Sequence, residues 1–218
     1  MYDKGKHIRR EGNDYSSESK HLFRHVSKVS RADRERLNNN RAFTLWLTGL
    51  SASGKSTIAN EIEAWMYSEQ IRAYVLDGDN TRSGINKDLT FSDMDRTENI
   101  RRVAEISKLF NDAGIIVIAA LISPFEKDRL MARNTINDDD FIEIFIDCSL
   151  PECINRDPKG LYKLALAGQI NNFAGINSTY EPPRAPEIHL RTDVNSIDEC
   201  VALVKNYLIN KMKFAENI

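Results

Sequence analysis

Apolar residues follow a repeating pattern along most of the chain, in which short continuous runs alternate with stretches at helical spacing. The continuous runs predict strands at 42–48, 73–76, 115–122 and 141–147, with a short fifth strand at 187–191. The helical spacing predicts amphipathic helices at about 56–69, 92–113 and 196–211. Strands of this kind between amphipathic helices indicate a parallel sheet that helices cover on both faces.

The first 40 residues are expected to form an extension to the main domain. Residues 1 to about 20 are polar and mixed in charge, which is typical of a tail. Residues 22–29 carry apolar positions at helical spacing, and Ser30 with Asp33 predicts the start of a charged helix over 31–37. The main domain is then expected to span residues 41–218.

One internal segment departs from the alternating pattern. Residues 158–186 contain no strong strand signal and are rich in Gly, Pro, Asn and Lys. A long segment of this kind inside a compact domain is often functional. We interpret residues 156–186 as a mobile lid over an active site.

Composition narrows the class of protein. Of the 218 residues, 41% are hydrophobic and 28% charged, as in ordinary globular domains, and the net charge of -2 gives no general attraction to nucleic acid or anionic membrane. The longest apolar run, at 115–122, is too short to cross a bilayer. Three cysteines without a CxxC pair argue against a disulfide framework, and with no secretory signal they favour a cytoplasmic protein.

The strongest chemical signal lies directly after the first predicted strand. Residues 49–56, GLSASGKS, match GxxxxGK[ST] between a strand and a helix. Gly49 and Gly54 allow successive N–H groups to turn inward and bind phosphate, Lys55 can reach the β- and γ-phosphates, and Ser56 can ligate Mg²⁺. A chance glycine turn is the alternative. The motif predicts an ATP or GTP site in a P-loop NTPase-like, three-layer α/β fold with about five parallel strands and a lid.

Acids and arginines follow the second predicted strand. Asp77 and Asp79 could accept a proton from an attacking hydroxyl or organise Mg²⁺, although an Asx-rich turn with solvated acids explains them too. Arg82 and Arg96 lie before or at a helix start, where they can bind anionic groups. Arg101 and Arg102 fall within a helix, so a solvated face is the better interpretation for them.

Two other classes of nucleotide-binding protein remain to be weighed. A GTPase should carry NKxD after a strand, and residues 86–89, NKDL, place the acid one position early. A regulatory nucleotide-binding subunit without activity would not need the lysine, serine and acids together. A kinase of another small phosphorylated metabolite stays open on these residues alone.

Taken together, the motifs resemble the adenylylsulfate (APS) kinase family. The resemblance spans about residues 43–193, and DGDN (77–80), ISPF (122–125) and DPKGLYK (157–163) in that order make it far more specific than the P-loop alone. It implies transfer of the γ-phosphate of ATP to the 3′-hydroxyl of APS, giving PAPS, with ATP and Mg²⁺ required.

The resemblance also implies roles for individual residues. It makes residues 49–57 the ATP loop, namely Gly49, Leu50, Ser51, Ala52, Ser53, Gly54, Lys55, Ser56 and Thr57, with Ser56 as metal ligand. Lys55, Asp77, Asp79 and Ser123 become the catalytic candidates, with Asp77 favoured as base or Mg²⁺ organiser. Phe91 and Phe173 become the pair that sandwiches the adenine of APS. The substrate-binding set is Asp77, Gly78, Asp79, Asn80, Arg82, Phe91, Arg96, Asn99, Ile122, Ser123, Lys159, Leu161 and Phe173.

By the resemblance, Ser123 is sometimes treated as a phosphoserine intermediate, but we favour direct in-line transfer, which needs no covalent step. Its hydroxyl could equally donate a hydrogen bond to substrate or cap the turn before Pro124. Ala52, Ser83 and Thr90 depart from the family pattern. The methyl of Ala52 is expected to be tolerable only if that residue avoids positive φ. By resemblance we expect a homodimer, and an ATP sulfurylase on a separate chain that supplies APS.

Overall fold

The computed structural model describes residue 25 and residues 27–212. Much of the predicted segment at 22–29 and the tail therefore lie outside the described residues. The helices are α1 (Arg31–Asn38), α2 (Lys55–Ser68), α3 (Gly78–Ser83), α4 (Asp93–Asp112), α5 (Glu126–Ile136), α6 (Leu150–Arg156), α7 (Leu161–Leu166) and α8 (Ile197–Met212), with a short 3₁₀ turn at Asp138–Asp140. The strands are β1 (Thr44–Thr48), β2 (Ala73–Asp77), β3 (Ile116–Ala120), β4 (Phe141–Asp147) and β5 (Ile188–Arg191).

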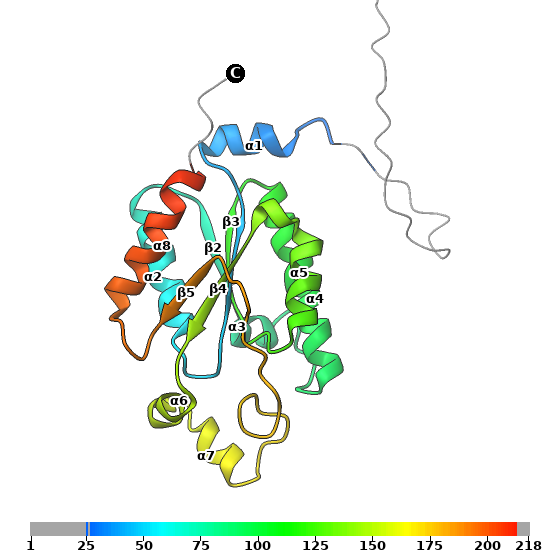
Figure 1. Ribbon diagram of the computed structural model, residues 1–218. Coiled ribbons are helices and arrows are strands. Elements are labelled where there is room, and N and C mark those ends of the chain that lie inside the picture. The colour runs from blue at the N-terminus through cyan, green and yellow to red at the C-terminus, as the bar shows by residue number, and fades with distance from the viewer. Residues whose placement is uncertain (1–24, 26, 213–218) are drawn as a thin grey trace, which may run out of the picture.

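The five strands form one parallel sheet in the order β2-β3-β1-β4-β5. In the register of this sheet, Leu45 pairs with Ile118 on one side and with Ile142 on the other. Helices α2 and α8 cover one face and α4 and α5 the other, while α6 and α7 lie beyond the carboxyl ends of the strands (Figure 1). The three-layer α/β fold with five parallel strands is confirmed.

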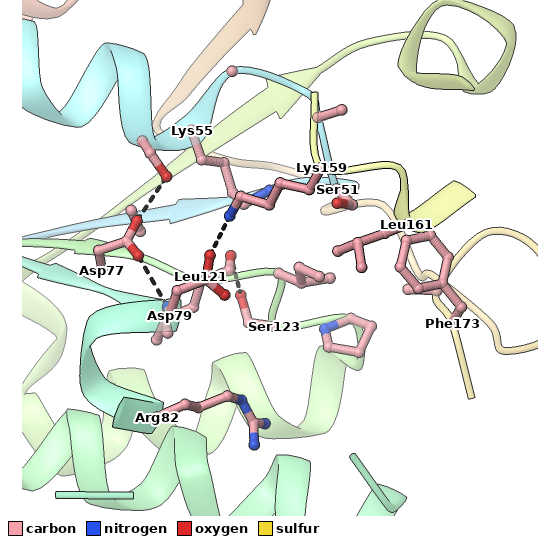
Figure 2. A pocket seen from close by; sticks show the side chains of 18 of the residues that line it. Ser51, Lys55, Asp77, Asp79, Arg82, Leu121, Ser123, Lys159, Leu161 and Phe173 are labelled. Atoms are coloured by element: carbon pink, nitrogen blue, oxygen red, sulfur yellow. Dashed lines mark hydrogen bonds and ion pairs between the residues drawn. The ribbon is translucent and has the colours of Figure 1, made fainter. Parts of the chain in front are cut away.

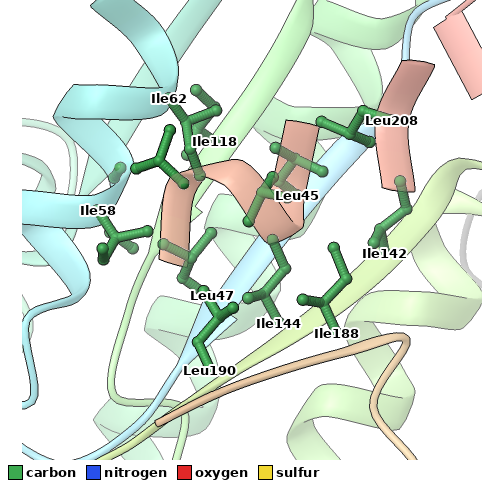
Figure 3. Packing of buried hydrophobic residues seen from close by; sticks show 14 of the residues in the cluster. Leu45, Leu47, Ile58, Ile62, Ile118, Ile142, Ile144, Ile188, Leu190 and Leu208 are labelled. Carbon is green, nitrogen blue, oxygen red and sulfur yellow. The ribbon is translucent and has the colours of Figure 1, made fainter. Parts of the chain in front are cut away.

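Alternation along β1 divides the core between the two faces, because successive side chains of a strand point to opposite sides. Leu45 and Leu47 pack with Ile58 and Ile62 of α2 and with Leu208 of α8 (Figure 3). Trp46, between the two leucines, belongs instead to the cluster beneath α4 and α5, together with Val103 and Ala132. All of these core side chains are at most 1% exposed.

Capping residues fix the ends of several helices as the sequence predicts. Ser92 Oγ accepts from the backbone N–H of Asp95 at the start of α4, and Gly114, at φ 78°, follows its end. Ser30 and Asp33 form a complete capping box on α1. Gly114 also contacts α1, because Asn38 Nδ2 donates to its carbonyl at 2.8 Å.

Helix α1 is held on the main domain by polar contacts at the end of the sheet away from α6 and α7 (Figure 1). Arg31 Nη2 donates to Asp140 Oδ1 at 3.0 Å, and the Asp140 side chain is only 5% exposed. Arg34 Nη1 lies 2.8 Å from Asp112 Oδ2 at the end of α4. The extension that precedes β1 therefore includes a docked helix.

Four helices differ from the sequence interpretation. Helix α3 occupies the segment that resembles an Asx-rich turn, so Arg82 lies within a helix and not before one. No helix is expected from the pattern at α5, whose buried positions include Asp128 and Arg129. Helices α6 and α7 give regular structure to the region around the start of the lid. In each case a short or polar helix lacks the apolar periodicity on which the prediction rests.

Candidate active site

The loop at residues 49–57 runs from β1 into α2 and has a backbone that glycine alone can satisfy at two places. A Cβ added at Gly49 would lie 2.4 Å from the carbonyl oxygen of Ile146, which no side chain could tolerate. Gly54 caps α2 at φ 100°, in the region that favours glycine. The loop therefore has the shape that directs backbone N–H groups toward a phosphate at a helix N-terminus.

Ala52 has a positive φ, although we expected its methyl group to be tolerable only if this residue avoided that region. Its φ is 59°, a left-handed conformation that costs an alanine about 1–2 kcal/mol because Cβ approaches the following carbonyl. The loop imposes this conformation between two fixed glycines, and the small methyl group is accepted there. The departure from the family pattern therefore falls at a strained position.

Lys55 is buried at the first position of α2, with only 8% of the residue exposed. Its Nζ donates to the carbonyl oxygens of Gly49 at 2.9 Å and Leu50 at 2.5 Å. Burial lowers the pKa of Lys55 to about 8, because desolvation disfavours the ammonium, and the carboxylates of Asp77 and Asp79 oppose the shift only in part. The lysine is thus held at the loop where a triphosphate would lie.

This lowered pKa predicts a pH dependence. Above about pH 8 the free protein loses the ammonium charge, so kcat/KM for ATP should fall with a midpoint near 8. Bound phosphates favour the ammonium, so kcat at saturating ATP should stay flat to higher pH. Steady-state rates between pH 6.5 and 10 would measure both. The variant Lys55→Arg keeps its charge and should lose the fall, and a fall that persists in it would assign the titration to another group.

Two carboxylates face the loop from the end of β2. Ser56 Oγ donates to Asp77 Oδ2 at 2.6 Å, and the backbone N–H of Asp79 donates to Asp77 Oδ1 at 2.9 Å, which caps α3. Asp79 forms an ion pair with Lys159 of the predicted lid, 80 residues away in the chain (Figure 2). The structure therefore joins the P-loop, the acidic pair and the lid in one chain of contacts.

Arginine and aromatic side chains gather on the other side of the site. The guanidinium carbon of Arg82 lies 4.5 Å from the centroid of the Phe91 ring, and that of Arg96 lies 5.8 Å from it. Arg82 Nη1 donates to the Thr90 carbonyl at 2.8 Å, and Arg96 Nε donates to the Phe91 carbonyl at 3.1 Å. These bonds hold two cations beside one ring in a form suited to an anionic aromatic ligand.

The two phenylalanines of the predicted sandwich differ in environment. Phe91 is 59% exposed, whereas Phe173 is 8% exposed and packs edge-on against Tyr162 at 4.9 Å between ring centroids. Both rings line the same cavity. The adenine sandwich stays a prediction.

Ser123 is buried at the bend that follows β3, with 2% of the residue exposed and a left-handed φ of 38°. Its Oγ accepts from Trp46 Nε1 at 3.2 Å, so Trp46 contributes to the site as well as to the core. The Ser123 carbonyl accepts from Arg129 Nη1 at 2.9 Å, and the Ile122 carbonyl accepts from Thr48 Oγ1 at 2.7 Å. This bend explains why the strand ends at Ala120 and not at residue 122.

One cavity of about 580 Å³ brings most of the candidate residues together. Gly49, Leu50, Ser53 and Asn80 lie outside its lining, with Asn80 exposed on α3. Arg156, Asp157 and Pro158 line it without an assigned role; the DPKGLYK motif could have pointed to Asp157 and Pro158, and Arg156 directly precedes it. The predicted residues in the lining are Ser51, Ala52, Gly54, Lys55, Ser56, Thr57, Asp77, Gly78, Asp79, Arg82, Phe91, Arg96, Asn99, Ile122, Ser123, Lys159, Leu161 and Phe173.

Arg101 and Arg102 stay out of the cavity lining, as expected for a helix surface. Arg101 pairs with Glu98 at 2.7 Å, and Arg102 pairs with Asp88 at 2.7 Å. Within the described part of the chain, the longest apolar helical stretches fall short of what a bilayer crossing requires.

Comparisons with known proteins agree on one family. The family model described as adenylylsulphate kinase matches residues 41–191. The adenylyl-sulfate kinase of Pseudomonas entomophila is 51% identical over 192 residues, covering 88% of this chain and 92% of that protein. The adenylyl-sulfate kinase of Oceanobacillus iheyensis is 51% identical over 185 residues, covering 85% of this chain and 93% of that protein. A solved APS kinase of Mycobacterium tuberculosis in complex with AMPPNP and APS is 46% identical, covers 77% of this chain and 98% of that chain, and has a TM-score of 0.75.

Proposed function

The chain belongs to the adenylylsulfate kinase family, and from this premise we propose that it transfers the γ-phosphate of ATP to the 3′-hydroxyl of APS, giving PAPS and ADP. One observation carries the proposal beyond family membership. The P-loop with Lys55, the carboxylates of Asp77 and Asp79, and the arginines beside Phe91 line a single cavity. Such an arrangement suits a triphosphate and an anionic nucleotide that meet at the acids.

On the ATP side, residues 49–57 would hold the phosphates through backbone N–H groups and the α2 N-terminus. Lys55 would move from the loop carbonyls to the β- and γ-phosphates, where its charge offsets the charge that develops during transfer. Little covalent chemistry is needed from the protein, because phosphoryl transfer is catalysed mainly by position and electrostatics.

The donor atoms at the mouth of the loop fit Mg²⁺. Ser56 Oγ and Asp77 Oδ2 lie 2.6 Å apart, and both are hard oxygen donors of the kind this ion prefers. Ser56 would bind the ion directly and Asp77 would hold it or one of its waters. When bound, Mg²⁺ supplies charge neutralisation on the phosphate oxygens.

The acceptor hydroxyl would approach the acids from the arginine side. As the 3′-oxygen forms its bond to the γ-phosphorus, the bond to the ADP oxygen breaks and the hydroxyl proton passes to a carboxylate. Asp77 is our first candidate for that carboxylate, because it faces Ser56, whereas Asp79 is paired with Lys159. In this scheme Lys159 and Leu161 close the site from the lid.

Arg82 provides a test of the division into two half-sites. The variant Arg82→Ala removes a guanidinium beside Phe91 and should raise KM for APS about 10- to 100-fold, as expected for the loss of a charge-assisted hydrogen bond. KM for ATP should change less than about twofold, since the P-loop is untouched. Arg101→Ala, on the outer surface of α4, is the matched control and should change neither. Equal weakening of both substrates in Arg82→Ala would contradict the assignment.

Ser123 tests direct transfer against a covalent intermediate. Its hydroxyl is buried and accepts from the Trp46 indole, a position that suits structural support better than nucleophilic attack. The variant Ser123→Ala should keep kcat within about tenfold of the parent, while the free energy of unfolding drops by about 1–3 kcal/mol because the indole N–H loses its acceptor. Turnover with APS and thermal melting measure the two effects. Near-total loss of turnover with intact binding, together with trapped phosphoenzyme in the parent protein, would refute direct transfer.

The activity itself is tested by ADP release, coupled to a reporter, with APS and a panel of other nucleotide and sugar-phosphate acceptors, with and without Mg²⁺. APS-dependent release that requires Mg²⁺ is expected. Release with a different acceptor would favour the kinase of another metabolite, and nucleotide binding without any release would favour a regulatory subunit.

Homodimerisation, by resemblance, is a further proposal that light scattering can check. The three buried free cysteines support a reducing cytoplasmic setting.

A further inference from the structure

Asn86 lies just behind the cavity, in the loop between α3 and α4. The residue is fully buried and is absent from the cavity lining. Its backbone N–H donates to the Thr81 carbonyl at 2.9 Å, and its own carbonyl accepts from the Leu89 N–H at 3.1 Å. The loop thus fixes the place of the Asn86 side chain before any ligand contact is considered.

The Asn86 side chain reaches one residue of the lining. Its Nδ2 donates to Asn99 Oδ1 at 3.0 Å, in a pair that is buried from solvent. Asn99 lines the cavity and lies three residues after Arg96 on α4, so the two side chains occupy the same face of that helix. Among the described residues, the hydrogen bonds of Asn86 reach the cavity lining only through Asn99.

This contact decides which end of the Asn99 amide faces the cavity. The oxygen accepts from Asn86, whereas Asn99 Nδ2 donates to no group among the described residues. Asn99 Nδ2 is also not one of the fully buried polar atoms that lack a hydrogen-bond partner in this part of the chain. Asn86 Oδ1 has no partner in the described part of the chain. In this orientation the Asn86 nitrogen has a partner, and if both amides were turned over that nitrogen would lose it while the oxygen gained Asn99 as donor.

We propose that Asn86 is a positioning residue that fixes Asn99 as a hydrogen-bond donor toward an acceptor oxygen of the anionic group held by Arg96. The inference rests on the proposed function, since that anionic group is then part of APS. An amide with its oxygen toward the cavity would repel the same group. Asn86 thereby sets the polarity of the acceptor half-site without touching the substrate.

Two variants separate this role from a packing role. Asn86→Leu is close in volume and removes the donor, so KM for APS should rise about tenfold with KM for ATP unchanged. Tm should change little, because the variant removes an unpartnered buried oxygen but also leaves Asn99 Oδ1 without its donor. Asn86→Asp, assayed at pH 8.5, accepts only, so Asn99 must turn its nitrogen to residue 86 and its oxygen to the ligand. KM for APS should then rise by more than in Asn86→Leu.

Asn40 offers a matched control at the opposite end of the sheet. It is buried, donates to the Arg41 carbonyl at 2.9 Å and also carries an unpartnered oxygen. Asn40→Leu should leave both KM values unchanged. An Asn86→Asp protein with the KM of the parent for APS, or Asn86 variants that behave like Asn40→Leu, would overturn the proposal.

A measurement on the parent protein covers the case in which the variants fail to fold. The side-chain amide signals of Asn99 in a ¹H–¹⁵N spectrum should shift when APS is added with ADP, a mixture in which no phosphate is transferred. Unshifted signals at saturating APS would overturn the proposal. If the parent gives no APS-dependent ADP release, the proposed function fails instead, so the two failures are distinguishable.

Discussion

Replacing Lys55 by alanine should lower kcat/KM with ATP and APS by at least about a thousandfold, with the fold intact. The ammonium is the one lysine charge buried within the loop, and a preorganised charge in a water-excluded site contributes several kcal/mol to the transition state. Alanine is also a good residue for the first turn of α2, so the helix should persist. ADP release and circular dichroism measure the two effects.

A control separates loss of this charge from loss of any lysine near the cavity. Lys163→Ala alters an exposed position on α7, in the predicted lid, and should keep activity near that of the parent. If Lys55→Ala retained substantial turnover, the P-loop would not be the catalytic phosphate site and the proposed mechanism would be wrong.

The second large effect is expected for Asp77→Asn, which should reduce kcat about 10²- to 10⁴-fold. The amide keeps the size of the side chain and can still cap α3, because asparagine caps helices as well as aspartate does. What it removes is the negative charge beside Ser56, and with it both proton acceptance and support for Mg²⁺. The rate should therefore fall without a matching drop in Tm.

Two comparison variants sharpen this result. Asp93→Asn, at an exposed position in the first turn of α4, should behave as the parent. Asp79→Asn should mainly disturb the pairing with Lys159, seen as a weaker affinity for substrate. A nearly active Asp77→Asn alongside an inactive Asp79→Asn would move the base assignment to Asp79.

The sheet could be predicted from the sequence because its signals are local. Continuous apolar runs mark β1 and β3, and the strand predicted at 141–147 has the same bounds as β4. The P-loop could be placed for the same reason, since its glycines, lysine and serine fall within eight residues. Local patterns suffice where neighbouring residues determine the structure.

Helix α5 could not be predicted, and its burial pattern explains why. Its buried positions are Asp128, Arg129, Ala132 and Ile136, so two of four are charged. Each charge is satisfied by a residue distant in sequence, Asp128 by Thr97 and Arg129 by Glu143 at 2.8 Å. Hydrophobic periodicity is lost when tertiary partners allow charges to be buried.

Parts of the site could not be predicted from the sequence either. Ser123 has a left-handed φ, and its hydrogen bond with Trp46 joins residues 77 positions apart in the chain. The ion pair between Asp79 and Lys159 likewise joins the first turn of α3 to the loop between α6 and α7. The sequence identifies which residues are suited to phosphate chemistry, but their pairing follows only from the folded chain.

The docked helix α1 has a practical consequence for shortened forms of the protein. The family match begins at residue 41, so a gene trimmed to that boundary would delete Arg31. Asp140, almost sealed from solvent, would then be left with Arg41, whose guanidinium nitrogen lies 3.7 Å away. An expression product that starts near residue 25 keeps this anchor, and is the safer material for crystallisation and for every assay described above.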